Sequence, residues 1–182
     1  MGRYVQWARR EPHPWQVVVT LVLGGSLFLA GLPLLLVAAG GWLDARFGLG
    51  PFDGGVPTMA TGVLLVVAGL AFAFWSVLAE VRIGHGTPVP MIPTRQLVVV
   101  PPFTYCRNPM VLGTTTAYLG VSVSIGSVSG IVLVVLFASL LLSYVKVLEE
   151  KELVLRFGEE YLEYKRTTPF LIPRLPPRSP NR

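Results

Sequence analysis

Two short polar segments carry the residues of this chain that could do chemistry. The first runs from Pro102 to Gly113 and contains Arg107, and the second is the acidic pair Glu149-Glu150, which follows a long apolar stretch. Arginine offers a planar fork of N–H donors that suits a carboxylate or a phosphate. Carboxylates accept hydrogen bonds from hydroxyl groups and attract positive charge. Because ionisable groups beside a membrane span need partners, the two segments predict a binding site for a ligand with both signs of charge.

A helix that starts at Pro109 would add backbone donors to this site. Proline is favoured in the first turn of a helix, and Asn108 before it is a suitable cap. The free N–H groups of such a helix start bind oxygen-rich ligands. S-adenosylmethionine would use all of these groups, and so would NADPH or a phospholipid head group. The residues alone leave these three ligands open.

Membrane spans are the predicted elements that hold the two segments. The chain is 52% hydrophobic and only 14% charged, which is too apolar for an ordinary soluble domain. The uncharged stretches 15–40 and 56–79 each exceed the roughly 20 residues that cross a bilayer. A third stretch, 109–145, is interrupted at 126–130 and predicts two helices of about 16–18 residues joined by a tight turn. We therefore expect an all-α integral membrane protein with about four transmembrane helices.

Basic residues fall almost entirely on one side of this arrangement. The N-terminal segment, the central segment 81–108 and the C-terminal tail hold fourteen of the fifteen Lys and Arg residues, and only Arg46 lies in the opposite loop. Such a bias favours the cytoplasmic side. We predict that both termini and the active site face the cytoplasm, in a bacterial inner (plasma) membrane. The net charge of +5 fits this rule and anionic lipid head groups, and no motif for binding nucleic acid accompanies it.

An amphipathic helix is predicted after Val145. Its apolar face carries four residues at spacings of four, four and three: Leu153, Phe157, Tyr161 and Tyr164. We expect this stripe to pack against the rest of the protein, Gly158 to interrupt the helix and Pro169 to end it. The single cysteine, Cys106, gives no disulfide framework and no metal cluster. Its thiol is interpreted as an apolar filler near the membrane surface.

These patterns divide the chain into three regions. Residues 1–83 form an N-terminal two-helix membrane region. Residues 84–173 comprise a loop, a transmembrane hairpin and the C-terminal helix, and would form the cofactor-binding catalytic region. Residues 174–182 are a Pro-rich tail.

The motifs of the second region resemble those of the isoprenylcysteine carboxyl methyltransferase and phospholipid N-methyltransferase superfamily of integral membrane enzymes. The similarity covers roughly residues 84–173 and rests on the order and separation of Gly86-Thr87-Pro88, Leu97-Val98, Pro102-Phe103-x-Tyr105-x-Arg107-Asn108-Pro109-Met110-x-x-Gly113, Glu149-Glu150-Lys151-Glu152-Leu153 and the segment 157–164. The chain departs from the superfamily's usual pattern in the first motif, where Pro101 stands for Gly, Phe103 and Val111 each stand for Tyr, and Thr104 stands for a basic residue. It departs again after Pro169, where Phe170-Leu171-Ile172-Pro173 stands for Arg-Phe-Ile-Pro.

The resemblance implies a methyltransferase that uses S-adenosylmethionine on a lipophilic or membrane-soluble acceptor, which enters from the bilayer. The sulfonium is already activated, so positioning and exclusion of water supply most of the catalysis. Arg107 and Glu150 are the implied catalytic residues, acting by position, and no metal is implied. The implied cofactor-binding residues are Gln96, Leu97, Val98, Phe103, Tyr105, Asn108, Pro109, Met110, Val111, Glu149 and Glu150.

Two alternatives stay open. A membrane NADPH-dependent reductase of the sterol-reductase type has a broadly similar C-terminal helical layout, although its dinucleotide would call for more basic residues than Arg82, Arg95 and Arg107. A non-enzymatic membrane scaffold is the other alternative, and the loss of two phenolic hydroxyls at Phe103 and Val111 is its best support.

Overall fold

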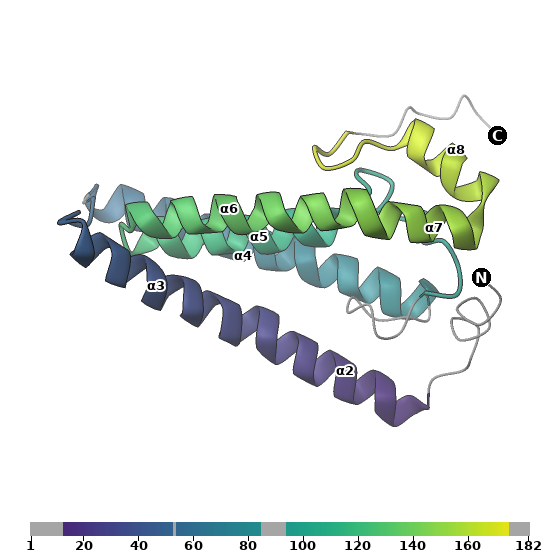
Figure 1. The fold of residues 1–182 in the computed structure, drawn as a ribbon, viewed down its shortest axis with the longest axis horizontal. Helices are drawn as coiled ribbons and strands as arrows, with labels where there is room; N and C mark the ends of the chain where they lie inside the picture. Colours follow the sequence, from purple (N-terminus) through teal and green to yellow (C-terminus); the bar gives the residue numbers. More distant parts are fainter. Residues whose placement is uncertain (1–12, 53, 85–93, 175–182) are drawn as a thin grey trace.

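The computed structural model describes residues 13–52, 54 to 84 and 94–174, and most of these residues lie in helices. Figure 1 shows long helices side by side and a short helical pair at one end. Their bounds, in chain order, are α2 Pro14–Ser26, η1 Leu27–Gly31, α3 Leu32–Arg46, α4 Gly55–Ala79, η2 Glu80–Gly84, α5 Pro109–Ser124, α6 Val128–Tyr144, η3 Val145–Glu149, α7 Glu150–Phe157 and α8 Glu159–Thr167. The three η segments are π-helical turns that continue the neighbouring α-helix. The predicted all-α class is confirmed.

The hairpin of α5 and α6 forms as predicted. The two helices have 16 and 17 residues and meet at a turn in which Gly126 has φ 68°. A side chain at Gly126 would lie 2.6 Å from the Phe52 carbonyl oxygen, so the turn needs glycine for space as well as for conformation. Ser127 then caps α6, with its Oγ accepting a hydrogen bond from the Gly130 N–H at 2.9 Å.

Among the described residues, three helical rods are long and apolar enough to cross a membrane: Trp15–Arg46, Gly55–Gly84 and Val128–Phe157. The fourth helix of the bundle, α5, has 16 residues and spans about 24 Å, less than the roughly 30 Å of bilayer hydrocarbon. The predicted number of four spans is therefore approximate. Eight residues of α5 are buried, because α4 and α6 pack on either side of it.

Glycines bring α4 and α5 into backbone contact. Gly62 and Gly69 on α4 face Gly120 and Gly113 on α5. A Cβ built on Gly69 would lie 2.5 Å from both the Ala117 nitrogen and the Gly113 oxygen. Membrane helices that lack a hydrophobic driving force for association use such small residues to gain close van der Waals packing. This contact fixes where the N-terminus of α5 lies relative to the end of α4.

The first rod joins the bundle through its second half only. The α3 part packs on α6 and α5, whereas α2 diverges from the other helices (Figure 1). The two parts meet at η1, where the Phe28 carbonyl accepts a hydrogen bond from the Tyr118 hydroxyl of α5. Many large apolar side chains of α2 are exposed, among them Trp15, Val22 and Leu23. Such a face suits contact with lipid.

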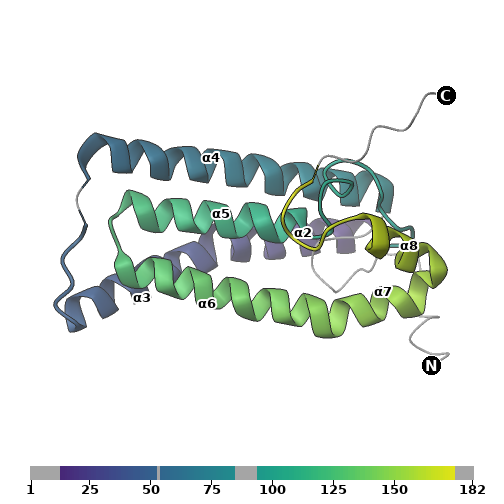
Figure 2. The same ribbon diagram turned by 90° about the horizontal axis from the view of Figure 1, so that it is seen from above.

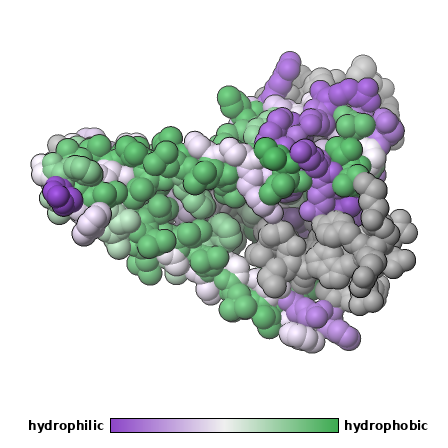
Figure 3. Space-filling view, viewed as in Figure 1, coloured by the Kyte–Doolittle hydropathy of each residue, from purple (hydrophilic) through white to green (hydrophobic). Residues whose placement is uncertain are grey.

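The polar segments gather at one end of the bundle. Figure 2 shows the end of α4, the start of α5 and the α7–α8 pair at the same end. In Figure 3 apolar residues cover the long shaft, while hydrophilic ones cluster around α7 and α8. This grouping is the one that a four-helix arrangement predicts. The membrane side that this end faces stays a prediction.

Asp44 ties the opposite end of the bundle together. It lies on α3 and accepts hydrogen bonds from the Ser129 N–H at 2.9 Å and from the Ser127 hydroxyl, so that it caps the start of α6 from another helix. Loss of a helix cap costs about 0.5–2 kcal/mol. We expect Asp44→Ala to lower the thermal midpoint of unfolding in detergent. Arg46→Ala, a change of an exposed residue one half-turn further on, is the control. Equal effects of the two substitutions would contradict the capping role.

Candidate functional site

The Arg107 segment is paired with the C-terminal strap, which we define as residues 168–174. The Arg107 N–H donates to the Pro169 carbonyl at 2.9 Å, and its Nε donates to the Thr168 carbonyl at 3.1 Å. The Asn108 Nδ2 donates to the Phe170 carbonyl at 2.8 Å. The strap therefore follows the start of α5 closely and fixes the side chains there.

Arg107 and Glu150 form an ion pair whose side chains are 7% and 5% exposed. Arg107 also donates to the Tyr161 hydroxyl at 3.2 Å, and Glu150 accepts from Lys165 Nζ at 2.7 Å. Lys146 Nζ lies 3.5 Å from the same carboxylate. The two residues predicted to be catalytic thus join α5, α7 and α8, and every oxygen of the Glu150 carboxylate has a cationic partner.

The predicted packing stripe supplies two hydroxyl groups to this cluster. Tyr164 donates to the Phe103 carbonyl at 2.7 Å, and Tyr161 accepts from Arg107. Burial raises the pKa of Tyr164, and burial followed by the nearby Glu150 charge raises the pKa of Tyr161. Both phenols therefore stay protonated at neutral pH. Gly158, with φ 55°, makes the bend between α7 and α8 that turns both rings inward.

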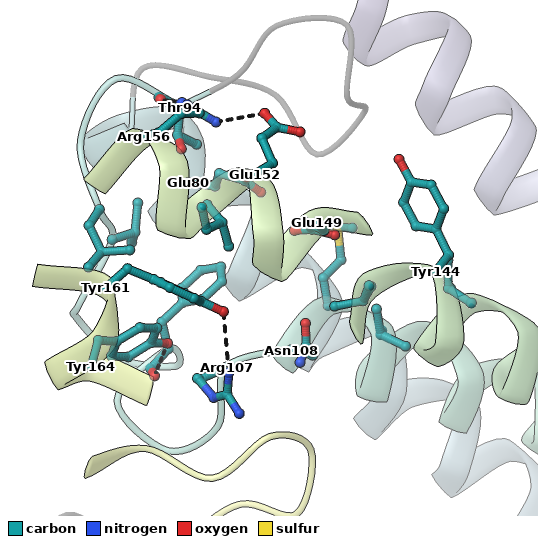
Figure 4. Close-up of a pocket in the computed structure, with 18 of the residues that line it drawn as sticks. Glu80, Thr94, Arg107, Asn108, Tyr144, Glu149, Glu152, Arg156, Tyr161 and Tyr164 are labelled. Carbon is teal, nitrogen blue, oxygen red and sulfur yellow. Dashed lines mark hydrogen bonds and ion pairs between the residues drawn. The ribbon is translucent and has the colours of Figure 1, made fainter. Parts of the chain in front are cut away.

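A cavity of about 220 Å³ lies between the start of α5, the ends of α4 and α6, and the α7–α8 pair. Its residues come from η1, η2, α5, α6, η3, α7 and α8 and from the loop before α5 (Figure 4). The lining comprises Phe28, Glu80, Thr94, Leu97, Val98, Phe103, Arg107, Asn108, Met110, Val111, Thr114, Leu141, Tyr144, Val145, Glu149, Glu152, Leu153, Arg156, Tyr161 and Tyr164. The cavity combines carboxylates, guanidinium groups and an apolar wall.

Most of the predicted site residues meet at this cavity. Eight of them line it: Leu97, Val98, Phe103, Arg107, Asn108, Met110, Val111 and Glu149. Four do not. Gln96 is exposed, Pro109 is fully buried in the helix start, Tyr105 packs edge-on against Trp75 at 6.0 Å, and Glu150 is held in the ion pair with Arg107. The Gly86-Thr87-Pro88 motif lies outside the residues that the structure describes.

Several lining residues were not singled out from the sequence. Glu80 is the first charged residue after the second apolar stretch, and an ionisable residue at a span end is a signal that could have found it. Arg156 donates to Glu152 at 3.1 Å and also to the Thr94 carbonyl, so it connects α7 to the loop. The i,i+4 spacing of Glu152 and Arg156 predicts their pairing. Nothing in the sequence predicts the hydrogen bond from Arg156 to the Thr94 carbonyl.

Cys106 lies inside the motif but away from the cavity lining. Its side chain is 0% exposed, and burial raises the pKa of its thiol, so the reactive thiolate is scarce at neutral pH. We expect the folded protein to resist a maleimide at pH 7 and to react once it is unfolded in denaturant. Mass spectrometry of the two samples measures this. Rapid labelling of the folded protein would contradict the role of Cys106 as an apolar filler.

A family model described as phospholipid methyltransferase matches residues 57–160, which is more than half of the chain. The matched range begins in α4 and ends in α8, and it contains most of the cavity lining. No curated protein and no solved structure matches the chain.

Proposed function

Because the chain belongs to the phospholipid methyltransferase family, we propose that it transfers a methyl group from S-adenosylmethionine to a lipophilic or membrane-soluble acceptor. The cavity at the start of α5 is the proposed site of transfer. The family supplies the class of enzyme, a membrane methyltransferase. The identity of the donor and the assignment of the residues are the parts that we propose.

The chemistry of the lining fits the methyl donor. S-adenosylmethionine carries a carboxylate, an ammonium, a sulfonium and ribose hydroxyls, and the cavity offers partners for both signs of charge. Asn108 and the free N–H groups at the start of α5 would receive oxygen atoms. Glu149 would receive a positive group or a hydroxyl. Leu97, Val98 and Met110 would pack against the adenosine moiety.

The protein itself would contribute by positioning the reactants and by excluding water from the site. The bound donor supplies an electrophilic methyl group that needs no further activation. Arg107 and Glu150 hold the start of α5, α7 and α8 together, and the strap is hydrogen-bonded to Arg107 and Asn108 beside them. A fixed geometry makes the reaction effectively unimolecular, and a water-poor site limits hydrolysis of the donor. In this proposal Arg107 and Glu150 are positioning residues.

The apolar end of the cavity supports a lipophilic acceptor. Phe28 of η1 and Leu141 and Tyr144 of α6 give the lining an apolar and aromatic part. A hydrocarbon chain could lie there with its reactive group toward Glu149. The reductase alternative receives less support, because the two guanidinium groups in the lining, Arg107 and Arg156, are already paired with Glu150 and Glu152.

Binding of the methylation product tests the proposal directly. The protein is purified in detergent and titrated by calorimetry with S-adenosylhomocysteine and, separately, with NADPH. We expect binding of the first and not of the second, and we expect Met110→Trp to abolish it by filling the cavity. Glu160→Gln, a change of an exposed residue on α8, is the control. Absence of S-adenosylhomocysteine binding at millimolar concentration, or binding of NADPH alone, would refute the proposed function.

A further inference from the structure

The carboxylates that line the cavity differ in whether a cation neutralises them. Glu152 is paired with Arg156 at 3.1 Å, and Glu150, just behind the lining, is surrounded by Arg107, Lys165 and Lys146. These contacts use both guanidinium groups of the cavity. Among the residues that the structure describes, no cation lies within ion-pair distance of Glu80 or Glu149.

Glu80 and Glu149 come from different spans but face the same cavity. Glu80 is the first residue of the π-helical turn η2, and Glu149 is the last residue of the π-helical turn η3. Figure 4 shows both at the cavity wall, and both line the cavity. Single π-helical turns within longer helices are frequent at functional sites. Two carboxylates so close to a bilayer are costly to ionise together, and a positive group bound between them would lower that cost.

Aromatic side chains surround the same space. Phe103, Tyr144 and Tyr161 line the cavity together with the two carboxylates. Ring faces attract ammonium and sulfonium groups, and the attraction is strongest where water is excluded. Unpaired carboxylates beside aromatic rings are the combination that recognises an organic cation with apolar substituents.

We propose that Glu80 and Glu149 form a cation subsite of this cavity, which binds the positively charged nitrogen or sulfur of an organic ligand. Glu80 is the new member, since it lies before the motifs that pointed to the site. The inference rests on the proposed function, which supplies two possible sources of such a cation. One is the methyl donor, through its sulfonium or ammonium, and the other is an amine-bearing acceptor.

The experiment compares three variants by ligand binding, without turnover. Glu80→Gln removes the charge and keeps the shape, Glu80→Asp keeps the charge, and Glu160→Gln removes an exposed charge of α8. The donor arm titrates S-adenosylhomocysteine and sinefungin, which carries an amine near the position of the sulfonium, by calorimetry. The acceptor arm places the protein in phosphatidylcholine nanodiscs and measures the shift of the thermal midpoint with dodecylamine and with dodecanoate. All variants must first elute as monodisperse protein with an unchanged midpoint when no ligand is added.

A charge-assisted contact is worth roughly 1.5–3 kcal/mol, which is about ten- to a hundredfold in affinity. We expect Glu80→Gln to lower the affinity for at least one cationic ligand by tenfold or more. Glu80→Asp should retain most of that affinity, and Glu160→Gln should leave it unchanged. If Glu80→Gln loses affinity for sinefungin alone, the subsite binds the reacting sulfur of the donor. If it loses affinity for both donor analogues, the subsite binds the amino-acid ammonium. Loss of dodecylamine binding alone assigns it to the acceptor.

Three results would overturn the inference. The first is a change of less than twofold for every cationic ligand, and the second is an equal loss for dodecanoate. The third is a wild-type protein that responds to neither sinefungin nor dodecylamine. Failure of the proposed function has a different signature, because wild-type protein that ignores S-adenosylhomocysteine but binds dodecylamine through Glu80 would keep the cation subsite and lose the methyl donor.

Discussion

Gly69→Leu is expected to abolish the folded state of the protein. The Cβ of any side chain at this position would lie 2.5 Å from backbone atoms of α5, and 3.0 Å from the Ala117 Cα. Backbone atoms cannot rotate aside as a flexible side chain can. The helices would have to separate along the whole α4–α5 contact, and that would move the start of α5 out of register with Glu80.

The size of the effect should grow with the side chain. Overpacking by even one methyl group typically costs about 1–3 kcal/mol, which is a large part of the stability of an ordinary domain. Gly69→Ala is therefore expected to leave a folded but less stable protein, and Gly69→Leu to leave none. Size-exclusion profiles and thermal midpoints in detergent measure both.

Gly41 offers a matched control on α3. A Cβ at this position meets no atom within 4 Å, and the residue is exposed in the helix. Alanine is a better helix former than glycine by about 1 kcal/mol, so Gly41→Ala should be neutral or stabilising, and Gly41→Leu should still fold. Similar losses at both glycines would contradict the view that the α4–α5 contact decides the fold.

Arg107→Ala is expected to destabilise the protein and to abolish methyl transfer together. The substitution leaves Glu150 buried without its guanidinium partner, and it removes the donors to Thr168 and Tyr161. Breaking one side of a buried ion pair typically costs about 3–5 kcal/mol. The strap would lose its Nε contact, and the cavity wall beside Asn108 would lose its support.

The control for Arg107 is an ion pair of the same type on the surface. Arg166 pairs with Glu163 at 2.8 Å, but the side chains are 68% and 63% exposed. Exposed pairs contribute about 0–1 kcal/mol, so Arg166→Ala should change the thermal midpoint little. Arg107→Lys should rescue little, because an ammonium cannot reproduce the fork of donors. Full stability of Arg107→Ala would show that the ion pair does not hold the site.

Strong local signals account for the parts of the fold that were predicted correctly. The α5–α6 turn is marked by Gly126 and Ser127, and the bend between α7 and α8 is marked by Gly158. The end of α8 near Pro169 follows from the missing N–H and the ring of proline. Such signals act within a few residues, so they need no knowledge of the tertiary structure.

The acidic pair shows where sequence reasoning stops. Glu149 and Glu150 are neighbours, and consecutive residues of an α-helix point about 100° apart. Glu149 faces the cavity, and Glu150 pairs with Arg107 and Lys165. The π-helical turn η3 ends at Glu149 and shifts the helical register there, and a sequence pattern does not predict that shift. The sequence predicts that the two motifs lie close together. It does not predict that Glu149 faces the cavity while Glu150 pairs with Arg107.

The sequence also could not predict which residues reach the site from distant parts of the chain. Glu80 and Thr94 lie at the cavity because glycines set the α4–α5 separation and because the loop folds back on Gly84, where the Arg95 N–H donates to the Gly84 carbonyl at 2.7 Å. A side chain at Gly84 would lie 2.8 Å from Thr94. These distances depend on which helices are in contact, and a single sequence does not predict those contacts.

The shortness of α5 has a consequence for the biogenesis of the protein. At 16 residues, with three consecutive threonines after Gly113 and two serines near its end, this helix is poorly suited to enter a bilayer alone. We expect it to insert only as a hairpin with α6, once the ribosome has released both. Glycosylation mapping of chains truncated before and after α6 measures the step. The helix at the centre of the fold would then reach its place only together with α6, and the site would assemble only after that step.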